Sequence, residues 1–274
     1  YIKYLSGITL QTIDTTSLNY PADSLDLEYY NTIYIASHFY NTANYINVSK
    51  FNGSSWNPLL DNGYDISNVD NNPNTFSLKI NSVDEYIAYI TNSYYPAVKK
   101  YSEGANSTWD PVGSLSTPQG GGISMAYDSA NNIYIEYTTT SMPTAIEVQK
   151  YNGTSWSNFP NTNTPPTSNP MEVSIAIDGN DVVYVAHRNN INPSRVAVVK
   201  CPQNGTEWTS AAGSDMYVSG TIKAAQDIQM AFDGNNRLYV VYYDFNSSDY
   251  SNYQLHIKRV NGSNWEEVDV INLP

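Results

Sequence analysis

Short hydrophobic runs alternate with polar turns along the whole chain, at a nearly constant spacing. Runs of this length, rich in Ile, Val and Tyr and bounded by Asn and Gly, are typical of β-strands. Every unit has the same order: a first run that ends near an acidic residue, a tight turn, a nearly uninterrupted apolar second run, a polar loop and a third run. The second runs are IYIAS, YIAYI, IYIEY, VYVAH and LYVVY.

A tryptophan-containing segment closes every unit. In four units an Asn-Gly pair precedes it, as in KYNGTSW (150–156), and Asn-Gly favours a hairpin because both turn residues need positive φ. All five tryptophans of the chain occupy this register, at spacings of 53, 47, 52 and 57 residues: Trp56, Trp109, Trp156, Trp208 and Trp265. Each unit is therefore predicted to be four antiparallel strands, with its tryptophan packed against a neighbouring unit.

The burial pattern favours a β-propeller over a β-sandwich. The second runs are apolar on both faces, whereas sandwich strands alternate apolar with polar residues. The first runs form a column of large residues (Leu25, Leu78, Met125, Ile175 and Met230) beside a column of small or polar ones (Ser24, Ser77, Ser124, Ser174 and Gln229). Radial stacking of four-stranded blades buries both faces and fits one column into the next. We therefore expect an all-β fold, one propeller domain over residues 1–274.

The pattern is compatible with either six or five blades. Five complete repeats cover approximately residues 23–60, 76–112, 122–160, 172–210 and 227–270. Residues 1–11 resemble a third and fourth strand without the tryptophan. We favour six blades, with the two inner strands of the first blade missing; five blades with a separate hairpin is the alternative. The chain starts at Tyr1, so we expect a processed form.

Composition narrows the functional classes. The net charge is −13, from 13 basic and 26 acidic residues, which repels phosphate backbones and argues against a nucleic-acid partner. The single cysteine, Cys201, excludes an intrachain disulfide. No apolar run approaches the ~18 residues of a membrane helix. A chain rich in Tyr, Asn, Ser and Thr with 14% charged residues indicates an extracellular or cell-surface protein.

The consensus of these units resembles the repeats of secreted bacterial β-propellers. The endings GSSW (53–56) and GTSW (153–156) are also similar to the back half of the sialidase Asp-box, although Phe51 and Tyr151 stand where that box has its Asp. Sialidases hold a carboxylate with three arginines from different blades; the four arginines here all lie in the last two units, which argues against that activity. The segment AFDGNNRLYVV (231–241) is similar to tachylectin-like sugar-binding propellers, an architectural resemblance only.

Loops that join second to third strands differ in sequence while the strands match, as expected where a constant scaffold carries recognition. They are rich in aromatic and amide side chains, which suit contacts with a glycan or a protein. His187 and Arg188 end the fourth unit's second strand and are predicted to lie at the rim of the central opening, as a ligand contact or as a solvated loop start. The candidate ligand-binding residues are His38, Phe39, Tyr40, Tyr94, Tyr95, His187, Arg188, Tyr243 and Phe245.

Three charges interrupt the apolar columns. Asp26 and Lys79 align with alanines of later units, and we expect a salt bridge between them because buried charges are paired. Glu136 stands where other units have Ala or Val. As a general acid or base it would need a second carboxylate in an open pocket.

Other polar residues have structural interpretations. The acids that end first strands, Glu28, Asp128, Asp178 and Asp233, are expected to accept hydrogen bonds from turn amides. The acidic loop 61–72 has oxygen ligands suited to Ca²⁺ but lacks regular ligand spacing, so we expect no cofactor and no metal site. Three scattered histidines make no zinc pattern.

These observations leave three functional hypotheses. The first is a non-catalytic exported or cell-surface module that binds a glycan or a protein through the loop face. The second is a propeller glycosidase or lyase that uses Glu136 with a second carboxylate. The third is a structural segment of a larger surface protein.

Overall fold

The computed structural model describes most of the chain and is all-β. For residues 2–6, 9–13, 39, 119, 120, 225, 226 and 245 it describes the backbone but not the side chains. The described residues are 2–6, 9–13, 24–39, 45–60, 66, 76–104, 107–115, 119–139, 144–161, 163–167, 169–190, 194–218, 225–245 and 253–272. They contain no helix long and apolar enough to cross a membrane.

Five antiparallel four-stranded sheets, here called blades 1 to 5, follow one another along the chain. Blade 1 contains β3 (Ser24–Tyr30), β4 (Thr32–Phe39), β5 (Tyr45–Phe51) and β6 (Trp56–Pro58). Blade 2 contains β7 (Phe76–Ile80), β8 (Glu85–Ile90), β9 (Pro96–Ser102) and β10 (Thr108–Pro111). Blade 3 contains β11 (Gln119–Tyr127), β12 (Ile133–Thr139), β13 (Ile146–Tyr151) and β14 (Trp156–Asn158). Blade 4 contains β15 (Pro170–Ile177), β16 (Val183–Asn189), β17 (Arg195–Cys201) and β18 (Thr209–Ser210). Blade 5 contains β19 (Ala225–Phe232), β20 (Leu238–Phe245), β21 (Tyr253–Asn261) and β22 (Asn264–Asn272).

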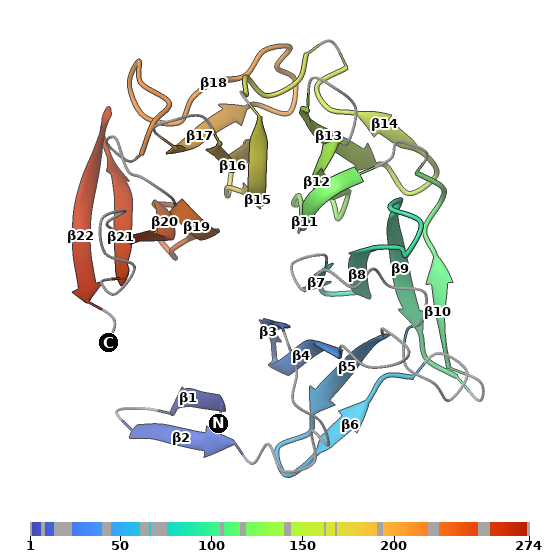
Figure 1. Ribbon diagram of the computed structural model, residues 1–274. Coiled ribbons are helices and arrows are strands. Elements are labelled where there is room, and N and C mark those ends of the chain that lie inside the picture. The colour runs from blue at the N-terminus through green and yellow to red at the C-terminus, as the bar shows by residue number, and fades with distance from the viewer. Residues whose placement is uncertain are drawn as a thin grey trace.

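The blades are arranged around a central axis with the first strand of each innermost (Figure 1). This confirms the predicted propeller of four-stranded antiparallel blades, and it corrects the blade number from six to five. Residues near the N-terminus form a separate two-stranded sheet, β1 (Ile2–Ser6) with β2 (Thr9–Ile13). The strand pattern there was recognised, but a two-stranded sheet has no inner strands and is not a blade.

Side chains from neighbouring blades form the core. The indole nitrogen of Trp109 donates a hydrogen bond to the carbonyl of Leu59 at 2.8 Å, and that of Trp156 donates to Val112 at 2.7 Å. Each acceptor follows the outer strand of the preceding blade. Trp208 packs against Phe159, with ring centroids 6.1 Å apart. Three of the five tryptophans that carry the sequence repeat, Trp109, Trp156 and Trp208, therefore join consecutive blades.

The inner strands are joined by a second repeated contact. A polar side chain on one blade accepts a hydrogen bond from a backbone amide on the next, which satisfies a donor that the sheet itself leaves unpaired. The four contacts are Leu78 N to Asp26 Oδ2 at 2.7 Å, Met125 N to Ser77 Oγ at 3.3 Å, Ile175 N to Ser124 Oγ at 3.2 Å and Met230 N to Ser174 Oγ at 3.1 Å.

Strand pairing shifts β3 by two residues relative to the register expected from the sequence. Asp26 pairs opposite Ala36 as Ser77 pairs opposite Ala88, so these two residues are counterparts. Glu28, not Asp26, lies level with Lys79 and forms the ion pair with it. The expected Asp26–Lys79 salt bridge is thus wrong in its acidic partner. A shift of two residues keeps every side chain on its face, so the alternation in SLDLE cannot reveal it.

Candidate ligand-binding pocket on the propeller axis

A cavity of about 1000 Å³ lies on the axis and is lined by the inner strands of all five blades. Three other cavities are smaller, at about 380, 320 and 230 Å³. One lining level contains the four side chains that join the inner strands, Asp26, Ser77, Ser124 and Ser174, together with their counterpart Gln229. The contacts that hold the blades together thus also form the wall of the cavity.

Irregular pairing in three inner strands shapes one end of this cavity. The register shifts between Gln119 and Ile123 in β11, between Met171 and Val173 in β15 and between Gln226 and Gln229 in β19. Such β-bulges redirect side chains and are frequent beside functional sites. Pairing on either side of the shifts makes Gly122, Glu172 and Asp227 counterparts in blades 3, 4 and 5, and all three line the cavity.

Glu172 and Asp227 adopt backbone angles that favour glycine, with φ of +49° and +52°. The left-handed region costs an L-residue about 1–2 kcal/mol. Blade 3 has glycines here instead, and a Cβ on Gly121 would lie 2.8 Å from Thr138 Oγ1. Strained backbone retained at a cavity wall motivates a functional hypothesis. Two blades therefore present a carboxylate to the axis where a third presents backbone only.

The carboxylate of Glu172 has two partners. One oxygen lies 3.0 Å from Arg188 Nη2, and the other accepts a hydrogen bond from Asp227 N at 2.6 Å. Burial raises the pKa of Glu172, and the Asp227 carboxylate also raises it, while Arg188 and the Asp227 amide lower it. The ion pair fixes the position of Glu172, and the Asp227 side chain remains exposed to the cavity.

Neutral polar groups surround the same end of the cavity. Asn169 accepts a hydrogen bond from Thr144 Oγ1 at 3.0 Å, and its carbonyl accepts one from Asn190 N at 3.1 Å. These three residues line the cavity together with Thr138 and Thr139. Apolar side chains, among them Phe76 and Met171, lie in the same lining. An array of hydroxyls, amides and carboxylates with a few apolar surfaces is suited to a ligand with many hydroxyl groups.

The structure buries the histidine candidates. His187 and His38 are completely buried, and the His38 ring centroid lies 6.4 Å from that of Phe76. Burial lowers the pKa of His187 to about 4, with Asn189 opposing the shift, so the ring is neutral at pH 7. Arg188 is also buried and pairs with Glu172 behind the cavity wall. The expected solvated loop start is therefore wrong; these residues support the wall rather than contact solvent.

The aromatic candidates do not converge on the cavity. Tyr94 and Tyr95 are exposed on the turn between β8 and β9, and Tyr94 has a φ of +63°. Tyr243 is half-buried on β20. None of these three lines the axial cavity. The backbones of Phe39 and Phe245 end β4 and β20, but their side chains, like all of Tyr40, lie outside the described residues.

Glu136 is sealed in the interior. Its side chain is 0% exposed, and neither carboxyl oxygen has a hydrogen-bond partner within the described part of the chain. It does not line the axial cavity. Burial raises its pKa well above the usual value, so the neutral acid is favoured. Catalysis by Glu136 requires an open pocket, and this completely buried side chain has none, which corrects its expected role as a general acid.

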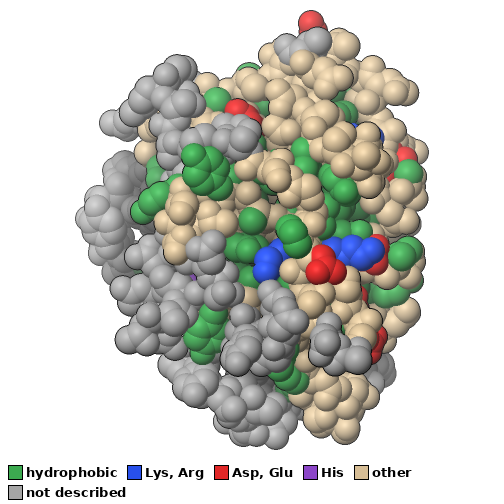
Figure 2. Space-filling model, turned by 90° about the vertical axis from the view of Figure 1, so that its right-hand side faces the viewer, with side chains coloured by type: hydrophobic (Ala, Val, Ile, Leu, Met, Phe, Trp, Pro, Cys, Tyr) green, Lys and Arg blue, Asp and Glu red, His purple; other side chains and the backbone are tan. Residues whose placement is uncertain are grey.

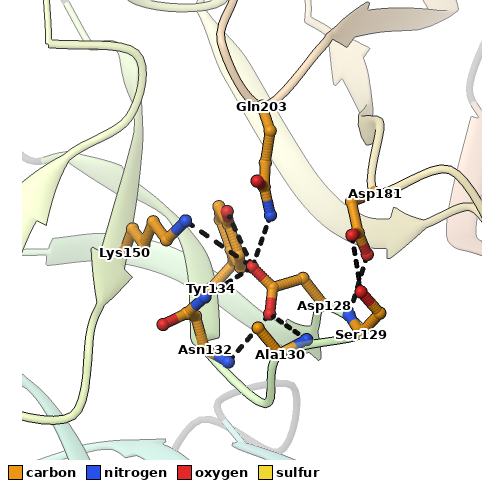
Figure 3. A network of polar contacts seen from close by, with 8 residues as sticks. All are labelled: Asp128, Ser129, Ala130, Asn132, Tyr134, Lys150, Asp181 and Gln203. Atoms are coloured by element: carbon orange, nitrogen blue, oxygen red, sulfur yellow. Dashed lines mark hydrogen bonds and ion pairs between the residues drawn. The ribbon is translucent and has the colours of Figure 1, made fainter.

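The turn acids lie at the opposite end of the blades and hold backbone amides. Asp128 Oδ1 accepts hydrogen bonds from the amides of Ala130 and Asn132 (Figure 3), and its other oxygen accepts one from Gln203 Nε2 at 2.6 Å. Asp178 and Asp233 bind their own turns in the same way. Glu28 has no such role because β3 continues past it to Tyr30.

Blade-to-blade contacts extend through these turns. Asp181 of blade 4 accepts hydrogen bonds from both the amide and the hydroxyl of Ser129 in blade 3 (Figure 3). Asn236 of blade 5 accepts one from Gly179 N of blade 4 at 2.7 Å. The turns of blades 3, 4 and 5 are thus joined by polar contacts, and the cavity lies toward the other end of the blades.

The four arginines are dispersed rather than gathered. Arg188 pairs with Glu172, Arg237 with Asp233 and Arg259 with Glu266, and Arg195 lies 4.7 Å from the ring centroid of Tyr217. None lines the axial cavity. This distribution provides no cluster that could hold a carboxylated ligand.

Metal ligands are not gathered in the described ranges either. These residues contain no group of three or more His, Cys, Asp or Glu that could hold an ion. Of the acidic loop 61–72, only Ile66 is described, so the calcium hypothesis falls outside the described residues. Cys201 is buried, and burial raises the pKa of its thiol.

The fold is shared with solved lectins and glycoside hydrolases. The BP39L lectin from Burkholderia pseudomallei aligns over 90% of this chain and 69% of its own, with 13% identity and a TM-score of 0.60. Trypanosoma rangeli sialidase, solved with sialic acid, aligns over 92% of this chain and 48% of its own, with 11% identity and a TM-score of 0.59. A thermostable family-43 glycoside hydrolase aligns over 92% and 94%, with 12% identity and a TM-score of 0.54. No protein-family model and no curated protein matches the sequence. At these identities the likeness concerns the fold.

Proposed function

We propose that this protein is an extracellular or cell-surface glycan-binding module whose ligand occupies the axial cavity. The observation that carries the proposal is the strained pair Glu172 and Asp227, held at the cavity wall by Arg188 and by a backbone amide. Carboxylates in such a position accept hydrogen bonds from vicinal hydroxyls, and Asn169, Asn190 and the threonines supply further partners.

The charges of the lining favour a neutral glycan over an acidic one. Asp26, Glu172 and Asp227 line the cavity, and Lys79 is the one basic residue among its described lining. Lys79 is already paired with Glu28. With a net charge of −13 on the chain, sialylated or sulfated sugars are repelled. On the face of the molecule in Figure 2, the few basic side chains lie near acidic ones. Lys100 pairs with Asp84 at 2.7 Å.

Calorimetry with neutral and sialylated oligosaccharides tests the proposal. Loss of a charge-assisted hydrogen bond costs ~1.5–3 kcal/mol, so Asp227→Asn should weaken binding of a neutral ligand roughly 10- to 100-fold. The matched control is Tyr94→Ala, an exposed residue outside the cavity, which should leave affinity unchanged. If binding survives Asp227→Asn and is lost in Tyr94→Ala, the ligand binds the loops and not the axial cavity. If the protein binds no neutral glycan, the proposal is overturned.

Glycoside hydrolysis is the second candidate, because Glu172 and Asp227 adjoin in one cavity and the pKa of Glu172 is raised. Its ion pair with Arg188 opposes protonation, which counts against a general acid. Incubation of bound oligosaccharides with the protein and with Glu172→Gln separates the two functions. Reducing ends released by the wild type and not by the variant indicate a hydrolase; intact ligand in both indicates a binding module.

A further inference from the structure

The propeller has one interface that differs from the rest. The inner strands pack in the pairs β3–β7, β7–β11, β11–β15 and β15–β19, and among the described strands no equivalent packing joins β19 back to β3. On β3 the large side chains that face this gap are exposed: Leu25 by 57%, Leu27 by 47% and Tyr29 by 71%. A row of exposed apolar residues on a strand of a folded domain marks an interaction surface.

The same positions are covered in blade 2. Strand pairing makes Phe76, Leu78 and Ile80 the counterparts of the three exposed residues. They are 8%, 0% and 3% exposed, because blade 1 packs over them. The sequence of β3 therefore maintains a complete blade-to-blade surface with no described inner strand against it.

The other side of the gap carries an acceptor position that has no partner among the described residues. Gln229 on β19 pairs opposite Val241, the register that Asp26, Ser77, Ser124 and Ser174 occupy in the other blades. Each of those accepts a hydrogen bond from the backbone amide of the next inner strand. Gln229 is exposed. Its natural partner by this pattern is the backbone N–H of an extended strand.

Away from the exposed β3 side chains, blade 1 has its own buried cluster. Trp56 on β6 and Ile35 on β4 are buried, although they belong to the same blade as the exposed β3 residues. The β1–β2 hairpin lies on this side, with β1 nearer the centre of the ring than β2 (Figure 1). Among the described strands β1 is hydrogen-bonded to β2 alone, so its inward edge can accept a further strand.

We propose that the space bounded by β1, β3 and β19 docks a β-hairpin of a second polypeptide. One strand of the hairpin pairs with the free edge of β1, and the other packs between Leu27 and Gln229. The hairpin has apolar residues at alternate positions, as the inner strands of the blades do. The inner hairpins of a second folded copy are integrated in its five described blades, so they do not supply it.

The chain itself provides a suitable probe. A synthetic peptide of residues 172–188 reproduces the inner hairpin of blade 4, which packs between two blades in this molecule. Titrated as a labelled peptide into the full chain, it should bind saturably. Leu27→Asp in the chain should weaken binding at least 10-fold, whereas Val83→Asp, at an exposed turn of blade 2, should not. Ile175→Asp in the peptide should also abolish binding.

Isolated hairpins are marginally stable, so a second measurement keeps the proposal falsifiable. The same segment, joined ahead of residue 1 through a flexible Gly/Ser linker, gains a high effective concentration. The fusion should raise Tm by several degrees, and Leu27→Asp should cancel the rise. No gain in Tm, or an equal gain in the Leu27→Asp fusion, would overturn the proposal. The residues Glu172 and Asp227 of the axial cavity are unchanged in every variant of the chain. Glycan affinity, measured separately, therefore tests the proposed function independently of hairpin docking.

Discussion

Glu28 on the inner strand of blade 1 forms an ion pair with Lys79, its counterpart on the inner strand of blade 2. Burial lowers the pKa of Lys79, and the nearby carboxylate of Asp26 raises it. Asp26 itself accepts the hydrogen bond of Leu78 N. Glu28 thus neutralises the cation of Lys79, and Asp26 holds a backbone amide of the next blade.

A double-mutant cycle in urea unfolding distinguishes these roles. The Glu28→Gln and Lys79→Met pair should show a coupling free energy of about 1 kcal/mol, as expected of a partly buried ion pair. The matched cycle with Asp26→Asn and Lys79→Met should give a smaller value. A larger coupling for Asp26 than for Glu28 would contradict the register assigned to β3.

The tryptophans offer a second matched pair. Trp109 donates its indole hydrogen bond to Leu59, whereas the indole nitrogen of Trp208 has no partner among the described residues. Both substitutions by Phe remove similar volume, but Trp109→Phe also leaves a carbonyl unsatisfied. We expect it to lower the free energy of unfolding by about 1–2 kcal/mol more than Trp208→Phe. Equal losses in chemical denaturation would show that the indole bond contributes nothing.

Glu136 should make the protein less stable as pH rises. Burial raises its pKa in the folded state, so the folded protein holds this proton more tightly than the unfolded chain. The stabilisation is complete below the unfolded pKa of about 4.3 and is lost as pH rises toward the folded value. Glu136→Gln should remove this loss, so its advantage over wild type should grow from pH 4 to pH 8.

The control for this experiment is Glu207→Gln, at an exposed position on blade 4. It should track the wild type at every pH. A Glu136→Gln variant whose advantage is the same at pH 4 and pH 8 would show that the buried acid does not titrate with folding.

His187 should have the opposite effect. Its pKa is lowered to about 4 by burial, below the ordinary value of about 6.5. The free energy of unfolding has its full value above pH 6.5, where the ring is neutral in both the folded and the unfolded state. It falls by about 3 kcal/mol in total as pH falls toward 4, because the unfolded chain binds the proton more tightly. His187→Gln should flatten this acid limb in unfolding experiments from pH 7 to pH 4. An unchanged acid limb would mean that another group protonates first.

Much of the fold was predictable because it repeats. Five copies of one strand order, each with its tryptophan, determine a propeller, and the continuous apolar second strands exclude a sheet with one wet face. The number of blades was not determined, because residues 1–11 have the strand pattern of half a blade and no local signal distinguishes a half blade from a separate hairpin. The register of β3 was lost for a related reason: a shift of two residues preserves the alternation.

The axial site was less accessible to sequence reasoning. Glu172 and Asp227 lie in bulges, and their left-handed backbone is set by pairing with β16 and β20 rather than by residue type. One sequence signal could have pointed to the axial site. A run of glycines at 120–122 in blade 3 stands where blades 4 and 5 have a carboxylate. His187 and Arg188 were expected at the rim of the central opening because they end a strand. Here the second strands remain buried to their ends.

The most direct measurement is a crystal structure of the protein soaked with a neutral oligosaccharide that it binds in solution. We predict density for a sugar in the axial cavity, with ring hydroxyls within hydrogen-bond distance of Asp227 and Glu172. Sugar bound over Tyr94 and Tyr95 with an empty cavity, at a ligand concentration that saturates binding in solution, would contradict the account.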